Sequence, residues 1–187
     1  MDAMTALTTR VSPLRLEAPA PSGDALEQIV AAALRAPDHG KLRPWRMFVI
    51  EGEGRHRLGA LMVDALKRRE PDAPEPLVER EAAKPLRAPM IIAVAAKVDA
   101  KHPKIPAIEQ ILSAGCAAQN IQLAAHALGF GCNWKTGDVT NDPEVKAAFG
   151  LGPDDRLVAF LYVGTPAATP PVKPLAPDAY VSRWPAG

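Results

Sequence analysis

Apolar residues recur along this chain with two different periods, which predict helices interleaved with strands. Where they return every three or four positions, one face of a helix is expected to pack on a core. The second such helix begins at Ser22 or Asp24 and ends before Pro37, and the last one begins at an Asp142-Pro143 cap. The predicted helices cover residues 2–9, 24–36, 55–70, 108–128 and 142–149.

Three continuous apolar runs have the length and the β-branched content of buried strands. The run at 88–98 is apolar at successive positions, which is typical of a strand in a sheet that helices cover on both faces. The segment at 130–137 is a short strand or a loop. The predicted strands therefore cover residues 46–52, 88–98 and 156–166.

The order of these elements predicts one α+β domain over residues 1–187 with a proline-rich, irregular tail from about residue 166. The segment at 71–89 carries many prolines and charges. We expect it to be an exposed excursion in which residues 77–83 form a helix. The sequence contains no internal repeat and no linker that would separate two cores.

Charge and composition exclude some partners. A net charge of +1 gives no electrostatic case for nucleic acid, and 5 % aromatic residues are too few for a base-stacking surface. The N-terminus lacks the apolar core of a signal peptide, and no apolar run reaches the roughly 18 residues of a membrane span. Cys116 and Cys132 are expected to be reduced core thiols. We therefore expect a cytoplasmic protein with no membrane or nucleic-acid partner.

Most catalytic signatures are missing. The chain has no G-x-S-x-G elbow, no phosphate-binding P-loop and no dinucleotide fingerprint. The spacing of its histidines, cysteines and carboxylates matches no metal site, and His126 is interpreted as an ordinary helix residue. No side chain is therefore assigned a catalytic role, and no metal is expected.

What remains is a set of groups suited to a phosphate. Arg10, Val11 and Ser12 offer a guanidinium and a hydroxyl near a helix end, and the segment at 134–137 offers an ammonium, a hydroxyl and backbone amides. Arg35 and His39 add further donors. Each group alone also has an ordinary structural explanation, such as a surface arginine, a turn threonine or a helix C-terminal cation.

Together these pieces resemble the nitroreductase family of FMN-dependent enzymes, and most closely its small, minimal members. The resemblance runs in order over about residues 1–166. It implies a mixed sheet wrapped by helices, in an intertwined homodimer whose FMN sites lie at the interface and are each held by both chains. The segments that carry it are TTRVS, RAPDHGKLRPWRMFVIEGEGR, RAPMIIAVAAK, IEQILSAGCAAQNIQLAAHALGFGCNWKTG and AFGLGPDDRLVAFLYVGTP.

The resemblance also implies roles for residues. Arg10, Val11 and Ser12 would hold the phosphate and ribityl chain of FMN. Arg35 and His39 would contact the flavin of the other subunit, and residues 124–129 would bind the nicotinamide nucleotide. A second phosphate-binding set, with Lys135 as its cation, comprises Trp134, Lys135 and Thr136.

Three departures from the family pattern bear on the flavin. Many larger members carry a lysine near the flavin N1 and C2 carbonyl where this chain has Leu14, so Arg35 or Arg15 is expected to meet the charge of the reduced ring. His39 and Arg43 replace smaller polar groups of the family frame, which makes the flavin edge more basic. Lys135 replaces an arginine and so loses its bidentate fork.

The expected function is that of an NAD(P)H-dependent oxidoreductase. NAD(P)H would reduce FMN by hydride transfer and leave, and a nitroaromatic or quinone-like acceptor would then take the hydride in a ping-pong cycle. The alternatives are a family member with different reductive chemistry, an FMN-binding or flavin-storage protein, and a dimer without flavin. The sequence does not choose between NADH and NADPH and does not name the acceptor.

Overall fold

The centre of the fold is a five-stranded sheet built around its longest strand, β5. That strand pairs with β3, with β4 and, at its last two residues, with β1, while β2 pairs with the far side of β3. A computed structural model describes residues 1–184, and every strand pair within that range is antiparallel. The strands are β1 (Leu16–Glu17), β2 (Trp45–Glu51), β3 (Met90–Ala96), β4 (Gly131–Lys135) and β5 (Arg156–Pro166).

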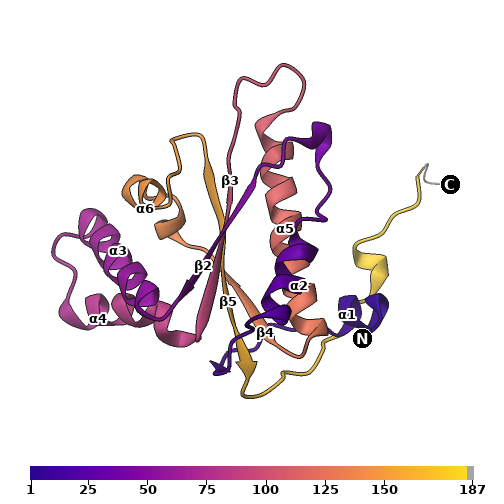
Figure 1. Ribbon diagram of the computed structural model, residues 1–187, viewed down its shortest axis with the longest axis horizontal. Coiled ribbons are helices and arrows are strands. Elements are labelled where there is room, and N and C mark those ends of the chain that lie inside the picture. Colours follow the sequence, from indigo (N-terminus) through magenta and orange to yellow (C-terminus); the bar gives the residue numbers. More distant parts are fainter. Residues whose placement is uncertain (185–187) are drawn as a thin grey trace.

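Helices cover both faces of this sheet. α2 and α5 lie on one face, and α3, α4 and α6 lie on the other (Figure 1). The helices are α1 (Ala3–Thr9), α2 (Asp24–Ala33), α3 (Glu53–Arg69), α4 (Glu75–Ala83), α5 (Ala107–Ala127) and α6 (Pro143–Ala148). Residues 1–184 also contain four short 3₁₀ turns: η1 (His39–Lys41), η2 (Lys84–Arg87), η3 (Asp138–Thr140) and, in the tail, η4 (Pro177–Ala179).

Alternate residues of β3 enter two separate cores. Ile92 and Val94 pack with α2 and α5, whereas Ile91 and Ala93 pack with α3 and α6. All seven residues of β3 are buried, because side chains on both faces of a helix-covered sheet leave water. The α+β class and the helix-covered sheet expected from the sequence are confirmed.

Two predictions about local structure were incomplete. Strand β1 was not predicted, because two residues are too few to show a period. The segment at 71–89 was expected to be an exposed excursion, but α4 and η2 within it pack on α3 and bury Glu81 and Pro85. The helix in this segment also begins at Glu75, earlier than expected.

A glycine permits the close approach of α4 to α3. A Cβ atom at Gly59 would come within 2.5 Å of the carbonyl oxygen of Ala82. Any larger residue at 59 would therefore push α4 outward. This contact fixes the position of Glu81, one residue before Ala82.

The long helix α5 is less enclosed than its composition suggested. Several of its small residues are fully buried, including Ala114, Ala118 and Ala125. Near its N-terminal end, however, Ile108 and Leu112 are each 59 % exposed. These two side chains lie one helical turn apart and so share a face, which leaves an apolar strip on the surface of the single chain.

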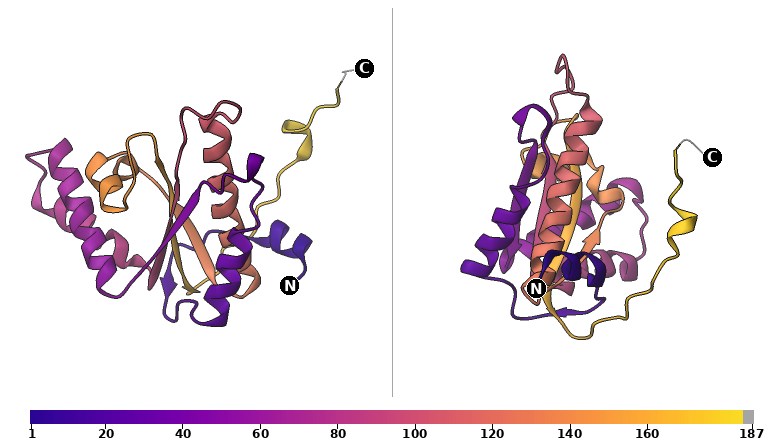
Figure 2. Two further views of the ribbon diagram at one scale, coloured as in Figure 1. Left: turned by 45° about the horizontal axis from the view of Figure 1, so that its top comes forward. Right: turned by 90° about the vertical axis from the view of Figure 1, so that its right-hand side faces the viewer.

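The chain after β5 leaves the body of the molecule. This tail runs outward from the end of β5 and away from the sheet, as two views show (Figure 2). Its residues are exposed from Ala167 to Trp184, including Leu175 and Tyr180. Between residues 167 and 184 the tail forms no helix or strand apart from the short turn η4.

Among residues 1–184, the helices are too short or too polar to cross a membrane. The same range holds no cluster of three histidine, cysteine or carboxylate side chains that would suit a metal ion.

Candidate functional site

A pocket of about 270 Å³ opens on the α3 and α4 side of the sheet. β4 and the residue after it contribute Lys135 and Thr136, and the segment before β1 contributes Leu14. Its apolar walls come from several elements. They comprise Leu14, Leu16, Met62, Val139 and Phe160. A pocket with apolar walls and a few polar groups is typical of a small-molecule or cofactor site.

The N-terminal segment is held against β4, so two of the predicted phosphate-binding sets lie near each other. Asn133 Nδ2 donates a hydrogen bond of 3.1 Å to the carbonyl oxygen of Pro13. A Cβ atom at Gly131 would lie 2.5 Å from Leu16 Cδ2 and 3.0 Å from Pro13 Cγ, so a larger residue there would displace these side chains. Neither Gly131 nor Asn133 was among the predicted site residues.

Arg10 directly follows α1 and lies beside the start of β4. Burial raises the pKa of the Cys132 thiol to about 12, and the positive charge of Arg10 opposes that rise. Arg10 Nη1 lies 3.5 Å from Ser12 Oγ, at the limit of a hydrogen bond. Val11 is partly buried between them. Residues 10–12 therefore flank β4, although they do not line the pocket.

The three residues 134–136 do not all face the pocket. Lys135 pairs across the sheet with Phe160 and enters the pocket with it. Trp134 points to the opposite face, where it packs against the core beneath α2 and α5. A direct contact between a pocket ligand and residue 134 would therefore involve its backbone rather than its indole.

Arg35 and His39 lie elsewhere in the single chain. Arg35 lines a separate hollow with Asp38 and Lys41. His39 Nδ1 lies 2.6 Å from Glu109 Oε2 at the start of α5, with both side chains partly exposed. The structure of one chain thus does not bring this pair to Lys135.

The segment 124–129 forms the end of α5 and its cap. The N–H groups of Leu128, Gly129 and Phe130 all donate to carbonyl oxygens of the last helical turn. Ala125 is fully buried. Packing and helix capping account for this segment, and it does not line the pocket.

The far end of the pocket is charged, a feature that the sequence analysis missed. Glu81, Lys84 and Arg87 line it from α4 and η2, together with Tyr162 of β5. Glu81 is only 7 % exposed and forms an ion pair with Lys84. A spacing of three residues between the charges in EREAAKPLR was the available signal, since it places them on one side of a helix.

The pKa of Tyr162 depends on the charges at the far end of the pocket. Burial raises the pKa of its hydroxyl to about 12, with Arg87 lowering it and Glu81 raising it further. The hydroxyl is therefore protonated at neutral pH and able to donate a hydrogen bond. Arg87 and Glu81 both lie close enough to act on it.

Arg15 does not line the pocket. Its Nη2 lies 3.0 Å from Glu17 Oε1 on an open surface, and the arginine side chain is 82 % exposed. Of the two cations expected to compensate for Leu14, Arg15 thus contacts Glu17 and Arg35 lines another hollow.

The donor groups fit a flavin mononucleotide. Lys135 and Thr136 offer a cation and a hydroxyl to a phosphate, and Arg10 and Ser12 lie beside the same strand. The apolar walls suit a flat aromatic ring, and the far end offers both hydrogen-bond donors and an acceptor.

The fold is that of an α+β domain whose sheet is covered by helices on both faces, with a ligand pocket against one face of that sheet. The sequence matches the Nitroreductase family model over residues 7–165, and the chain belongs to the nitroreductase family. It is 45 % identical to Escherichia coli K12 "Putative NAD(P)H nitroreductase YdjA" over 166 residues, which is 89 % of each chain.

Solved structures agree on the fold. A nitroreductase-like family protein from Bacillus cereus has a TM-score of 0.83 at 23 % identity, with 100 % of this chain and 97 % of that chain covered. The structure described as a "putative nitroreductase in complex with fmn" from Desulfovibrio desulfuricans has a TM-score of 0.74 at 22 % identity, with 100 % of this chain and 99 % of that chain covered.

Proposed function

We propose that the protein is an FMN-dependent oxidoreductase that uses NAD(P)H to reduce nitroaromatic or quinone-like acceptors in a ping-pong cycle. The observation that carries this proposal is the pocket that joins Lys135 and Thr136 to apolar walls in a nitroreductase fold. The relative named as an NAD(P)H nitroreductase and the fold neighbour solved with FMN support it. Bound FMN would supply the hydride chemistry.

The chain's own residues would bind and orient the cofactor. Lys135 and Thr136 would hold the phosphate from β4, and Arg10 and Ser12 would hold it from the segment after α1. Asn133 would keep these two segments in register through its hydrogen bond to Pro13. The protein would thereby fix the flavin by positioned charges, with no side chain acting as a general acid.

A homodimer completes this proposal. Arg35 and His39 lie away from the pocket of their own chain, which fits a role toward the flavin of a second copy. The exposed Ile108 and Leu112 give that copy an apolar surface to cover, and the extended tail gives it a second one. Helix α5, whose inner face packs in the core, would then lie at the interface, which accounts for the exposed Ile108 and Leu112.

One experiment tests the function. The purified protein is incubated with FMN and freed of unbound flavin, and its visible spectrum is followed after anaerobic addition of NADH or NADPH. We expect a yellow protein whose flavin absorbance bleaches within seconds and returns when a nitroaromatic or a quinone is added. A colourless protein would refute the proposal, and a yellow protein that neither nucleotide bleaches would favour flavin storage.

A further inference from the structure

We propose that the hollow lined by Arg35, Lys41 and Arg43 binds the adenosine end of NADPH, with Lys41 and Arg43 holding the 2′-phosphate that NADH lacks. This inference rests on the proposed function, because it takes the electron donor to be a nicotinamide nucleotide. It names the nucleotide that this function uses, a choice that the sequence leaves open. It also gives a role to two cations of the loop before β2 that have none so far.

The hollow has the composition of a site for a phosphate joined to an aromatic ring. Its volume is about 350 Å³. The three cations Arg35, Lys41 and Arg43 face the single carboxylate of Asp38, which leaves an excess of two positive charges. The apolar part of its lining comprises Leu34, Ala36 and Trp45.

A 2′-phosphate matches this excess of charge. A phosphate monoester carries a charge of about −1.5 to −2 at pH 7. The planar guanidinium of Arg43 can donate to two phosphate oxygens at once, and the ammonium of Lys41 supplies a second point charge. The adenine ring would pack against the apolar lining. NADH has only a hydroxyl at this position, so it would gain little from either cation.

The side chains of Lys41 and Arg43 are available to a ligand. Within residues 1–184, neither takes part in an ion pair or donates a side-chain hydrogen bond. The backbone N–H of Arg43 donates to Asp38 Oδ2 at 2.8 Å, and its carbonyl oxygen accepts from Arg46 Nη1 at 2.9 Å. Asp38 thus holds the backbone of the loop and is paired with neither of the two cations.

The backbone at both cations adopts a conformation that favours glycine. Lys41 has a φ of 57° and Arg43 a φ of 51°, in the left-handed region where a Cβ atom is crowded. Such strain costs free energy and is concentrated at functional sites. Glycine at either position would relieve it. A function of the two long cationic side chains accounts for their presence there.

Contacts with α5 and the loop before it hold this segment in place. Ser113 Oγ donates a hydrogen bond of 2.7 Å to the carbonyl oxygen of Pro37. A Cβ atom at Gly40 would lie 2.4 Å from Ile105 Cδ1, so η1 packs directly on that side chain. Because the loop is already ordered, binding a phosphate there would cost little conformational entropy.

The hollow also suits the proposed homodimer. Arg35 lines it, and the same residue is proposed to reach the flavin of the second copy. A nucleotide whose 2′-phosphate lies at Lys41 and Arg43 would therefore lie next to that flavin. The segment 124–129, to which the resemblance assigned the nucleotide, is explained by packing and helix capping.

Two adenosine nucleotides test the hollow without flavin chemistry. Adenosine 2′,5′-bisphosphate carries the 2′-phosphate of NADPH, and adenosine 5′-monophosphate lacks it. By isothermal titration, the wild-type protein should bind the bisphosphate at least about tenfold more tightly. Arg43→Gln removes one cation and should lose most of this preference. Lys101→Gln, in the exposed loop before α5, should keep it.

Lys41→Gly separates a loss of binding from a loss of folding. Glycine adopts the backbone of position 41 without strain, so this variant should unfold within about 3 °C of the wild type. It should nevertheless lose most of the preference for the bisphosphate. In turnover, the ratio of kcat/KM for NADPH to kcat/KM for NADH should fall about tenfold in Lys41→Gly and in Arg43→Gln.

The outcomes separate this inference from the proposed function. Equal affinity of the wild type for the two nucleotides, or a preference that survives in both variants, would overturn the site and leave the flavoprotein intact. Inorganic phosphate that binds as tightly as the bisphosphate would show a bare anion site and overturn the adenosine assignment. If neither NADH nor NADPH bleaches bound FMN, the proposed function fails, and the titrations still decide whether the hollow binds a 2′-phosphate.

Discussion

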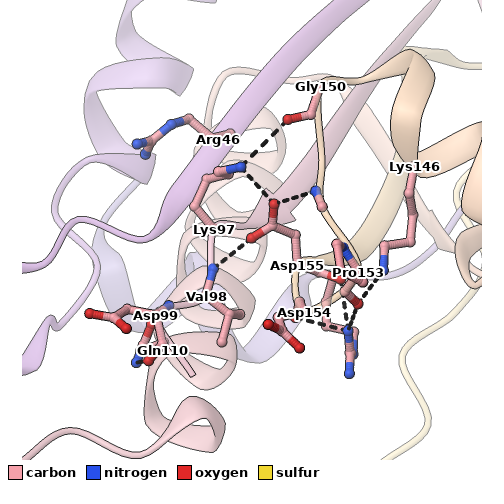
Figure 3. A network of polar contacts seen from close by, with 12 residues as sticks. Arg46, Lys97, Val98, Asp99, Gln110, Lys146, Gly150, Pro153, Asp154 and Asp155 are labelled. Atoms are coloured by element: carbon pink, nitrogen blue, oxygen red, sulfur yellow. Dashed lines mark hydrogen bonds and ion pairs between the residues drawn. The ribbon is translucent and has the colours of Figure 1, made fainter. Parts of the chain in front are cut away.

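Lys97 Nζ lies 2.6 Å from Asp155 Oδ2 and joins the end of β3 to the start of β5 (Figure 3). Asp155 is 4 % exposed and accepts two further bonds, from the backbone N–H of Val98 at 2.8 Å and of Gly152 at 2.7 Å. Because β3 and β5 are central strands of the sheet, this carboxylate fixes the ends of the two strands against each other.

Removing this carboxylate should destabilise the fold. Asp155→Ala leaves two backbone N–H groups and the Lys97 ammonium without their acceptor, and we expect a loss of about 3 kcal/mol in the free energy of unfolding. Urea denaturation followed by circular dichroism measures it. Asp154→Ala removes an exposed neighbouring carboxylate and should change stability by less than about 0.5 kcal/mol. Equal losses in the two variants would contradict a specific role for Asp155.

The same pair predicts a pH dependence. Burial acts to raise the pKa of Asp155, but the hydrogen bonds from Lys97, Gly152 and Val98 outweigh burial and hold it below its ordinary value of 3.8. Since the pKa is lower in the folded state, the stabilisation is complete above about pH 3.8 and is lost as the pH falls through the folded-state pKa. The stability gap between wild type and Asp155→Ala should therefore be constant near neutral pH and narrow in acid. A gap that widens below pH 3.8 would contradict this assignment.

The sheet was predictable from the sequence because its central strands are covered on both faces. Helices on each side make β3 and β5 continuous apolar runs, and such runs stand out in any sequence. The burial of Glu81 was not predictable, because it depends on the approach of α4 to Gly59, which is distant along the chain. Judged by its own composition alone, a charged segment flanked by prolines is predicted to be exposed to solvent.

The binding residues were predicted from the resemblance to a family. Their spacing along the sequence does not by itself indicate that they form one site. Nothing local to Arg10 indicates that it lies beside Cys132, more than a hundred residues away. That proximity follows from the packing of the N-terminal segment on β4, which Gly131 permits. Contacts between distant segments determine which residues form a site, but they produce no periodic pattern in the sequence.

Lys135 should contribute to binding through the phosphate of FMN. Loss of a charge-assisted hydrogen bond costs about 1.5–3 kcal/mol, so Lys135→Ala should weaken FMN binding about 10- to 100-fold. Riboflavin lacks the phosphate, so its affinity should be the same in the variant and the wild type. Isothermal titration of both ligands measures these effects, and Lys101→Ala in the exposed loop before α5 is the control. An equal loss for riboflavin would place Lys135 away from the phosphate.

The apolar strip on α5 should be an interface. Leu112→Glu introduces a charge where the side chain is 59 % exposed in the single chain, so an isolated chain would tolerate it. In a homodimer it would bury an unpaired charge, and we expect a monomer by sedimentation velocity. Arg57→Glu places the same residue on exposed α3, in the opposite layer, and should keep the wild-type mass. A dimer in both variants would place the interface elsewhere.

Mixed dimers can show whether one flavin site uses two chains. In the proposed homodimer, Arg35 of one chain and Lys135 of its partner serve the same site, so Arg35→Ala and Lys135→Ala should each weaken both sites when present alone. A heterodimer of the two variants has one site with both wild-type residues and one site with neither. Differently tagged variants can be co-expressed, isolated as heterodimers and titrated with FMN. We expect half of the sites to bind with wild-type affinity. If both residues serve the site of their own chain, every site keeps one defect and no fraction recovers, which would refute the shared site while leaving FMN binding itself intact.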